Sequence, residues 1–251
     1  RDQHERAKHD AESARKKPAK NADRTETFTP VTPTKPVGFV SVCAGDGVAN
    51  LFKDLGVDTI VSGGQTMNPS TDDILKAVES TPAETVYVLP NNKNIIMAAE
   101  QTIPLSTRKV IVIHTRTIPQ GISAMLAFDP DTDCEANAIE MQKSTERIAT
   151  GQITFAARDS DYDGHQIKKG ELLALNGGKV AFTETELDKC VLKLLKQMMD
   201  SQFITVIYGE DVSDEQAAEI EEQIQQKYGA KAEITLINGG QPIYYYILSV
   251  E

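Results

Sequence analysis

The sequence has few cysteines and no long apolar run. Its three cysteines, Cys43, Cys134 and Cys190, are far apart, odd in number and without Cys-x-x-Cys spacing. We therefore expect neither a disulfide framework nor a structural zinc site, and a reducing, cytoplasmic environment is the simplest compartment. We expect Cys43, which lies in an apolar run, to be a buried small hydrophobe. No segment approaches the ~20 apolar residues that a membrane-spanning helix needs, so no membrane span is expected.

The sequence also lacks the common catalytic signatures. It contains no Gly-x-x-x-x-Gly-Lys-Ser/Thr loop, no Gly-x-Gly-x-x-Gly fingerprint, no Gly-x-Ser-x-Gly elbow and no His-Glu-x-x-His helix. The four histidines, at positions 4, 9, 114 and 165, are too dispersed to indicate a metal site. We therefore expect no catalytic residue, metal or cofactor in this chain.

The composition is that of a globular protein. The chain has 251 residues, of which 40% are hydrophobic and 25% charged, enough for one or two domains with a sizeable core. It begins at Arg1, with no initiator Met and no signal-like region, so we expect it to be a fragment of something longer.

Charge is distributed unevenly along the chain, whose net charge is −11. Residues 1–36 hold 9 Lys/Arg and 6 Asp/Glu, a net of +3, and residues 37–251 hold the remaining 17 and 31, a net of −14. A body this acidic repels phosphate backbones, so binding to nucleic acid is not expected. The basic stretch at residues 15–20 is interpreted as part of a solvated linker.

Hydrophobic patterning divides the chain into an arm and two lobes. Residues 1–36 form a polar arm without an apolar stripe, ending in a linker rich in proline and threonine. Residues 37–117 alternate short apolar runs with helical patterns, which indicates parallel β-α-β units with both sheet faces covered. Residues 118–251 predict a mixed α+β lobe. The fold class is therefore α/β, with these strands expected in the first lobe: 37–43, 57–61, 85–89 and 109–113.

Two local signals stand out in the second lobe. Ser213-x-x-Gln216 matches a capping box for a helix over 213–228. Asp159-Ser-Asp-Tyr-Asp-Gly164 begins like a calcium-binding loop, but Gly170 stands at the twelfth position, where a bidentate Glu is needed. We therefore interpret this segment as an acidic hairpin turn.

The most informative loop follows the second strand of the first lobe. In parallel sheets, ligands bind at the carboxyl ends of strands, and this loop has two glycines, several polar side chains and a following helix N-terminus. An anion site and a tight turn with an N-cap, provided by Ser70 or Thr71, both remain open. The candidate binding residues here are Ser62, Gly63, Gly64, Gln65, Thr66, Asn68 and Ser70.

Two further strand ends supply candidates at the same edge. Asn91, Asn92 and Asn94 follow the third strand and Arg116 the fourth, although a plain turn and a surface arginine are the simpler interpretations. Lys93 and Arg116 are then at most two nearby cations, which suits a carboxylate or a peptide surface better than a triphosphate. We favour bracing of the fold and contact with a partner over binding of a small ligand.

Several long segments resemble one known family. Gly63–Thr71, Leu89–Ile96, Thr115–Gly121 and Gly239–Tyr244, together with the Ser-Val-Glu ending, occur in the order typical of the C-terminal domain of FakA, a bacterial fatty acid kinase component of the dihydroxyacetone-kinase-like family. The resemblance runs from about Val37 to the C-terminus. One departure is Asp46, where the family has Glu.

The resemblance implies a DegV-like two-lobe architecture and a kinase whose other parts lie elsewhere. ATP and magnesium would bind a preceding N-terminal domain, and the whole protein, which could form a homodimer, would phosphorylate a fatty acid held by a separate binding subunit (FakB). The acyl phosphate product would feed phospholipid synthesis. This chain would be a non-catalytic domain that engages the binding subunit, with the loop at 62–70 as the counterpart of the one that grips the fatty acid carboxylate there. A small-anion or acyl-ligand sensor is the alternative, and a phosphatase or transferase, for which no nucleophile–base pair can be named, is a third.

Overall fold

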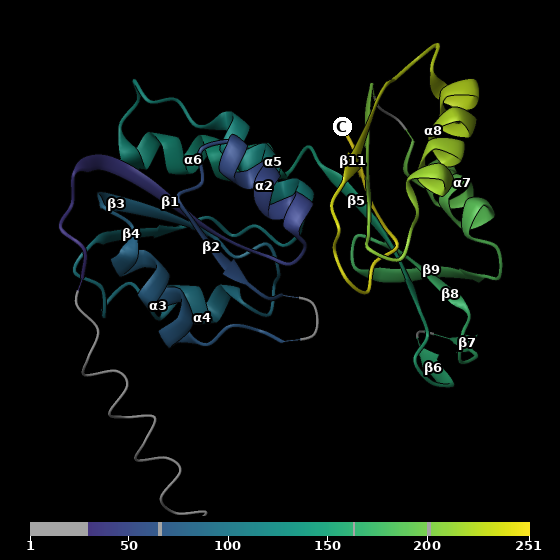
Figure 1. Cartoon of the computed structure of the whole chain (residues 1–251), viewed down its shortest axis with the longest axis horizontal. Helices are drawn as coiled ribbons and strands as arrows, with labels where there is room; N and C mark the ends of the chain where they lie inside the picture. Colours follow the sequence, from purple (N-terminus) through teal and green to yellow (C-terminus); the bar gives the residue numbers. More distant parts are fainter. Residues whose placement is uncertain (1–29, 65–66, 163, 200–201) are drawn as a thin grey trace, which may run out of the picture.

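The chain folds into two lobes that lie side by side (Figure 1). The computed structural model describes residues 30–64, 67–162, 164–199 and 202–251. Most of the arm and linker expected over 1–36 lies outside these residues. No helix in the described part of the chain has both the length and the apolar character needed to cross a membrane.

The first lobe contains a four-stranded, fully parallel sheet, as the alternating pattern predicts. Its strand order is β2-β1-β3-β4. The two central strands are mostly buried and apolar. Strand β1 begins two residues earlier than predicted because the N–H groups of Thr34 and Lys35 bond to the Pro82 carbonyl. The strands are β1 (Lys35–Cys43), β2 (Thr59–Ser62), β3 (Ala83–Leu89) and β4 (Lys109–Val112).

Helices cover both faces of this sheet (Figure 1). Helices α3 (Thr71–Ser80) and α4 (Ile96–Glu100) pack on one face, and α2 (Asp46–Asp54), α5 (Ile118–Ala127) and α6 (Cys134–Thr145) on the other. The sequence places the boundary between the lobes at residue 117, which would put α5 and α6 in the second lobe. In the structure, the buried side chains of these two helices belong to the core of the first sheet. They do so because their apolar faces complete the layer that α2 begins.

The second lobe is built on a mixed six-stranded sheet with strand order β11-β10-β12-β5-β8-β9. Only β10 and β11 pair in parallel. Strand β9 is not expected from the sequence, whereas the acidic segment forms the expected hairpin, β6–β7. The strands are β5 (Ala149–Phe155), β6 (Ser160–Tyr162), β7 (His165–Ile167), β8 (Leu172–Asn176), β9 (Lys179–Glu184), β10 (Phe203–Tyr208), β11 (Glu233–Asn238) and β12 (Tyr246–Val250).

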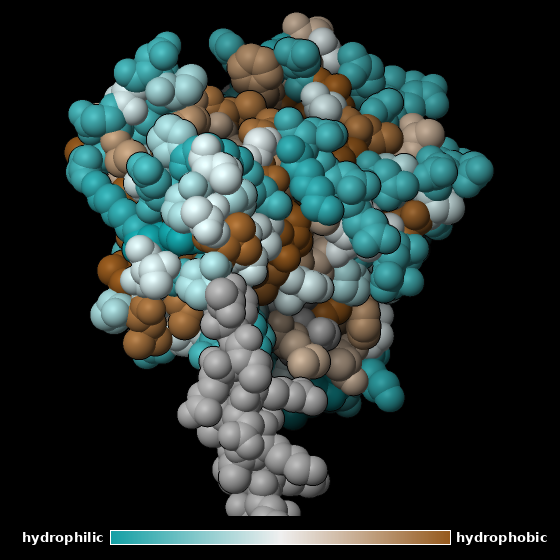
Figure 2. Space-filling view, turned by 60° about the vertical axis from the view of Figure 1, so that its left-hand side comes forward, coloured by the Kyte–Doolittle hydropathy of each residue, from teal (hydrophilic) through white to brown (hydrophobic). Residues whose placement is uncertain are grey.

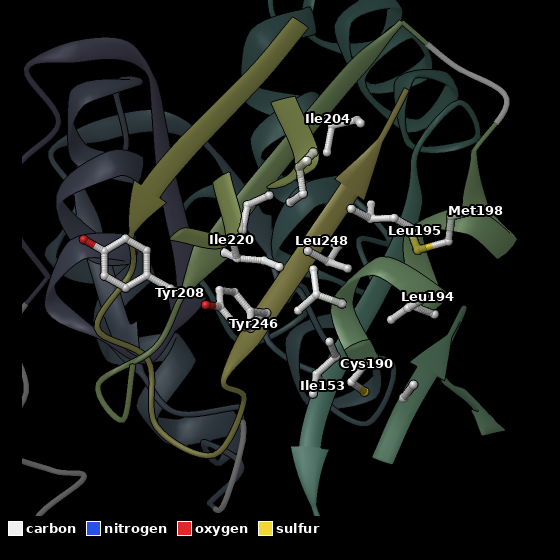
Figure 3. Close-up of a cluster of buried hydrophobic side chains, with 14 of the residues drawn as sticks. Ile153, Cys190, Leu194, Leu195, Met198, Ile204, Tyr208, Ile220, Tyr246 and Leu248 are labelled. Atoms are coloured by element: carbon white, nitrogen blue, oxygen red, sulfur yellow. The ribbon is translucent and has the colours of Figure 1, made fainter. Parts of the chain in front are cut away.

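Helices α7 (Leu187–Met198) and α8 (Asp214–Tyr228) cover one face of the second sheet and close its core. Figure 3 shows side chains of α7 and of the strands pointing into the same space, with Tyr208 and Tyr246 at one end. The Tyr208 hydroxyl donates to Asp214 Oδ1 (2.7 Å) at the start of α8. The predicted capping box is confirmed, since Ser213 and Gln216 each bond to the other's backbone N–H.

The two lobes share a core and a glycine contact. Ile207 and Ile247, on the other face of the second sheet, belong to the same hydrophobic cluster as the buried side chains of α2 and α5. The N–H of Val48 donates to the Gly239 carbonyl (3.0 Å). A Cβ on Gly47 would lie 1.9 Å from the Asn238 carbonyl oxygen, so only glycine permits this approach of the two backbones.

The surface shown in Figure 2 is a mosaic. Hydrophobic atoms appear in several separate places between hydrophilic side chains. Large exposed apolar side chains belong to different elements, among them Met97 on α4, Leu126 on α5 and Phe203 on β10. Isolated exposed apolar residues of this kind are normal on protein surfaces and do not by themselves mark a binding face.

Candidate functional site

A cavity of about 440 Å³ lies between the two lobes, at the edge where the strands of the first sheet end. This position agrees with the general location of ligand sites in parallel sheets. Its walls come from the loops after β1, β2, β3 and β4 and from the second lobe, where the β8–β9 turn faces them. The residues that line it include Cys43, Gly63, Gly64, Asn91, Asn92, Lys93, Asn94, Arg116, Thr117, Ile118, Gln152, Gly177, Gly178, Lys179 and Tyr244.

The glycine loop after β2 is a tight turn. Gly63 and Gly64 adopt φ values of 145° and 97°, which favour glycine. The N–H of Gly63 donates to the Cys43 carbonyl (3.1 Å) and that of Gly64 to the Met67 carbonyl (3.0 Å). Both donors are therefore satisfied by the protein's own backbone, and the loop provides the wall of the cavity.

The other candidates of this loop lie differently. Ser62, Asn68 and Ser70 are exposed and are not among the residues that line the cavity. Ser70 caps α3 instead, because its side chain accepts from the Asp73 N–H (3.1 Å) and the Asp73 carboxylate accepts from the Ser70 N–H (2.9 Å). Gln65 and Thr66 lie outside the described residues.

Asn91 braces three strands at the floor of the cavity. It is buried and has a left-handed backbone (φ 57°), a conformation that asparagine tolerates better than most residues. Its Nδ2 donates to Ser41 Oγ and to the Val42 carbonyl (both 2.9 Å), and its N–H donates to Thr115 Oγ1 (3.0 Å). Asn91 therefore ties the ends of β1, β3 and β4 together.

The helix that follows β4 packs tightly on this brace. A Cβ on Gly121 of α5 would lie 2.2 Å from Asn91 Oδ1, so the glycine lets the helix approach the carboxamide. Asn92 holds the neighbouring loop, since its Nδ2 donates to the Gly64 carbonyl (2.7 Å) and its Oδ1 accepts from the Asn94 N–H (2.9 Å). Two of the three asparagines thus position loops.

We expect the substitution Asn91→Gly to lower the free energy of unfolding by about 2 kcal/mol, because it leaves buried groups of Ser41 and Val42 unpaired while keeping the left-handed backbone easy to adopt. Urea unfolding followed by circular dichroism measures the change. Asn94→Gly is the matched control, because Asn94 is exposed and the described residues give its side chain no hydrogen bond. Equal losses in the two variants would contradict the bracing role.

Three cations line the cavity, one more than the sequence indicates. Lys93 and Arg116 stand at the strand ends of the first lobe, and Lys179 follows the Gly177-Gly178 turn of the second lobe. All three are exposed. Sequence patterns miss Lys179 because they mark Asn176–Gly178 only as a turn, and nothing local says that this hairpin faces the first sheet.

Two titratable groups that line the cavity are held in their neutral forms. Among the described residues, no cluster of His, Cys, Asp or Glu could hold a metal ion. Cys43 is buried, as predicted, and burial raises the pKa of its thiol to about 12. Burial also raises the pKa of Tyr244. Both groups therefore stay protonated at neutral pH, which makes Cys43 a poor nucleophile.

Comparison with known proteins places the chain in one family. The model for the C-terminal domain of FakA-like proteins, the A-like subunits of fatty acid kinase, matches residues 38–251. "Protein YloV" of Bacillus subtilis is 45% identical over 220 residues, which cover 86% of this chain and 39% of that protein. The chain thus spans about two-fifths of the length of this relative.

Solved structures show the fold. The DegV family protein Cg2579 of Corynebacterium glutamicum has a TM-score of 0.62 at 15% identity, covering 86% of this chain and 96% of that one. The Streptococcus pneumoniae fatty acid kinase B3 protein, solved with linoleic acid, has a TM-score of 0.56 at 12% identity, covering 86% and 99%. At these identities the comparison establishes the two-lobe DegV-like architecture that the sequence resemblance implied.

Proposed function

Since this chain belongs to the family of FakA-like C-terminal domains, we propose that it is the part of a fatty acid kinase that engages the fatty acid-binding subunit. The observation that carries the proposal is the family match along 38–251, nearly the whole described body. The binding subunit would present its fatty acid to an ATP-binding domain elsewhere in the longer protein. The resulting acyl phosphate would enter phospholipid synthesis.

Two observations support a binding role rather than a catalytic one. The chain spans 39% of the YloV protein, so most of such a protein, including a site for ATP and magnesium, would lie outside it. In the described part of the cavity wall, no nucleophile lies within hydrogen-bonding distance of a general base, and the Cys43 thiol is held protonated. We infer that phosphoryl transfer takes place in the other domains.

A direct binding experiment tests this role. We expect this chain, immobilised, to bind a DegV-like fatty acid-binding protein loaded with fatty acid and to form no acyl phosphate when ATP and magnesium are added. Serum albumin loaded with the same fatty acid is the control, because it carries the ligand on an unrelated protein. Failure to bind the DegV-like protein, or acyl phosphate formation by these two proteins without any other, would contradict the proposal.

The alternative function is that of an acyl-ligand binding module. Measuring the binding of free fatty acid to this chain distinguishes it from the docking role. If the cavity held an acyl chain, the isolated chain would bind free fatty acid saturably and would remove it from albumin. We expect neither, because three cations and several amide residues line the cavity between the lobes beside its apolar residues, which suits a polar ligand better than an acyl chain. The core of the second lobe is filled by the side chains shown in Figure 3.

A further inference from the structure

We propose that the cavity between the lobes binds a phosphoryl group through Lys93, Arg116 and Lys179. The ligand class is inorganic phosphate or a small phosphate ester or acyl phosphate. This site does not depend on the docking role proposed above, and it is measured on this chain without any partner.

The charge of the cavity contrasts with that of the protein around it. Residues 37–251 carry a net charge of −14, so acidic side chains outnumber basic ones almost two to one. The cavity reverses this ratio: three basic side chains line it, and none of its described lining residues is Asp or Glu. In the part of the chain that the structure describes, none of the three forms a salt bridge. Their charge is therefore available to an anion.

The three cations come from three separate segments that only the fold brings together. Lys93 lies in the β3–α4 loop, Arg116 in the β4–α5 loop and Lys179 at the start of β9. The shared core and the contact between Val48 and Gly239 fix one lobe against the other. The backbone segments that carry the three cations are thus fixed around the cavity before any ligand arrives, so binding requires no movement of one lobe against the other.

Neutral hydrogen-bond donors and a helix N-terminus add to the positive electrostatic potential of the cavity. Asn94 and Gln152 line the cavity, as do Thr117 and Ile118 at the N-terminus of α5, a helix of ten residues. The dipole of a helix places partial positive charge at its N-terminus. These groups supplement the three cations, which supply most of the positive charge.

The number of cations favours phosphate over carboxylate. A single carboxylate carries one charge and is matched by one arginine, whereas a phosphate monoester carries about −1.5 to −2 at neutral pH and has three acceptor oxygens. If only Lys93 and Arg116 lined the cavity, their two charges would suit a carboxylate. The third charge, on Lys179, makes a phosphoryl group the better match. The volume of about 440 Å³ lies within the range of small-molecule sites.

Calorimetric titration of this chain at constant ionic strength tests the proposal. The probes are inorganic phosphate, acetyl phosphate and ATP without magnesium, with acetate as the carboxylate control. We expect saturable binding of at least one phosphoryl probe and none of acetate in the same concentration range. The probe that binds most tightly identifies the source of the phosphoryl group.

Variants then locate the site. Lys179→Ala and Arg116→Ala are each expected to weaken binding about tenfold, and the double variant to abolish it, as loss of charged hydrogen bonds predicts. Lys196→Ala is the matched control, since Lys196 is an exposed lysine of α7 outside the cavity. Thermal melts of each variant show that the fold is retained.

Three outcomes would overturn the proposal. One is the absence of saturable binding for every phosphoryl probe, and another is acetate binding as tight as that of phosphate. The third is equal binding by the cavity variants and the Lys196→Ala control, which would place the anion elsewhere. None of these outcomes bears on whether the chain binds a fatty acid-binding protein. The failure of this proposal can therefore be told apart from the failure of the proposed function.

Discussion

Replacing Gly47 with alanine is expected to lower the free energy of unfolding by about 3 kcal/mol, at the upper end of the cost of overpacking. The new Cβ would lie 1.9 Å from the Asn238 carbonyl oxygen, far inside van der Waals contact, so the turn at 238–241 and the start of α2 must move apart. That movement opens the contact between the lobes. Urea unfolding followed by circular dichroism measures the loss.

The direction of the stability change for Gly47→Ala distinguishes a close contact between the lobes from an ordinary helix position. In a helix without such a contact, Gly→Ala stabilises by about 0.5–1 kcal/mol, because glycine is the more flexible residue. Asn50→Ala is the control on the same helix, since Asn50 is exposed, and it should change stability by no more than about 0.5 kcal/mol. A stabilised Gly47→Ala protein would show that the lobes do not depend on this contact.

Arg108→Met is expected to cost about 3 kcal/mol, because it removes the hydrogen bonds that a buried, charged guanidinium donates to three backbone carbonyls. Arg108 is buried, and its Nη2 donates to the carbonyls of Val31, Glu79 (3.1 Å) and Thr81 (3.3 Å). It thereby holds the segment before β1 against α3. Arg147→Met, at an exposed position after α6, is the control and should be nearly neutral.

The pH dependence of this loss tests whether Arg108 stabilises the fold together with Glu79. Burial raises the pKa of the Glu79 carboxyl, but hydrogen bonds from Thr107 and Ser106 and the charge of Arg108 outweigh it, so the pKa is lowered. A lowered pKa stabilises the fold at neutral pH, and this contribution is lost as pH falls through the folded-state value. The difference between wild type and Arg108→Met should therefore shrink from pH 7 toward acid. A difference that is constant with pH would exclude coupling to Glu79.

Local signals in the sequence predict the first lobe well. Continuous apolar runs separated by single helices indicate a parallel sheet, and all four of its strands lie where expected. Their observed ends differ from the predicted ones by no more than two residues. The capping box at Ser213 and the hairpin in the acidic segment are also visible. Each of these features depends on residues a few positions apart, so one stretch of sequence contains the whole signal.

The candidate site is predictable only in part. Strand ends of a parallel sheet must meet at one edge, so Gly63, Gly64, Asn91 and Arg116 can be placed together from the pattern alone. The roles within that group cannot be foreseen. Asn91 and Ser70 are both candidates for ligand contact by residue type, and the hydrogen bonds show that one ties strands together and the other caps a helix.

The sequence by itself determined most of the elements, the parallel direction of the strands in the first sheet and the edge at which a site should be sought, because hydrophobic period and turn chemistry act over short distances. Tertiary structure alone decided which distant segments meet. It brings Lys179 to the same cavity as Lys93 and Arg116, and it places Gly47 against Asn238, far away along the chain. No local pattern records such pairings, because they arise from packing one lobe on the other, and that packing gives the cavity its positive charge.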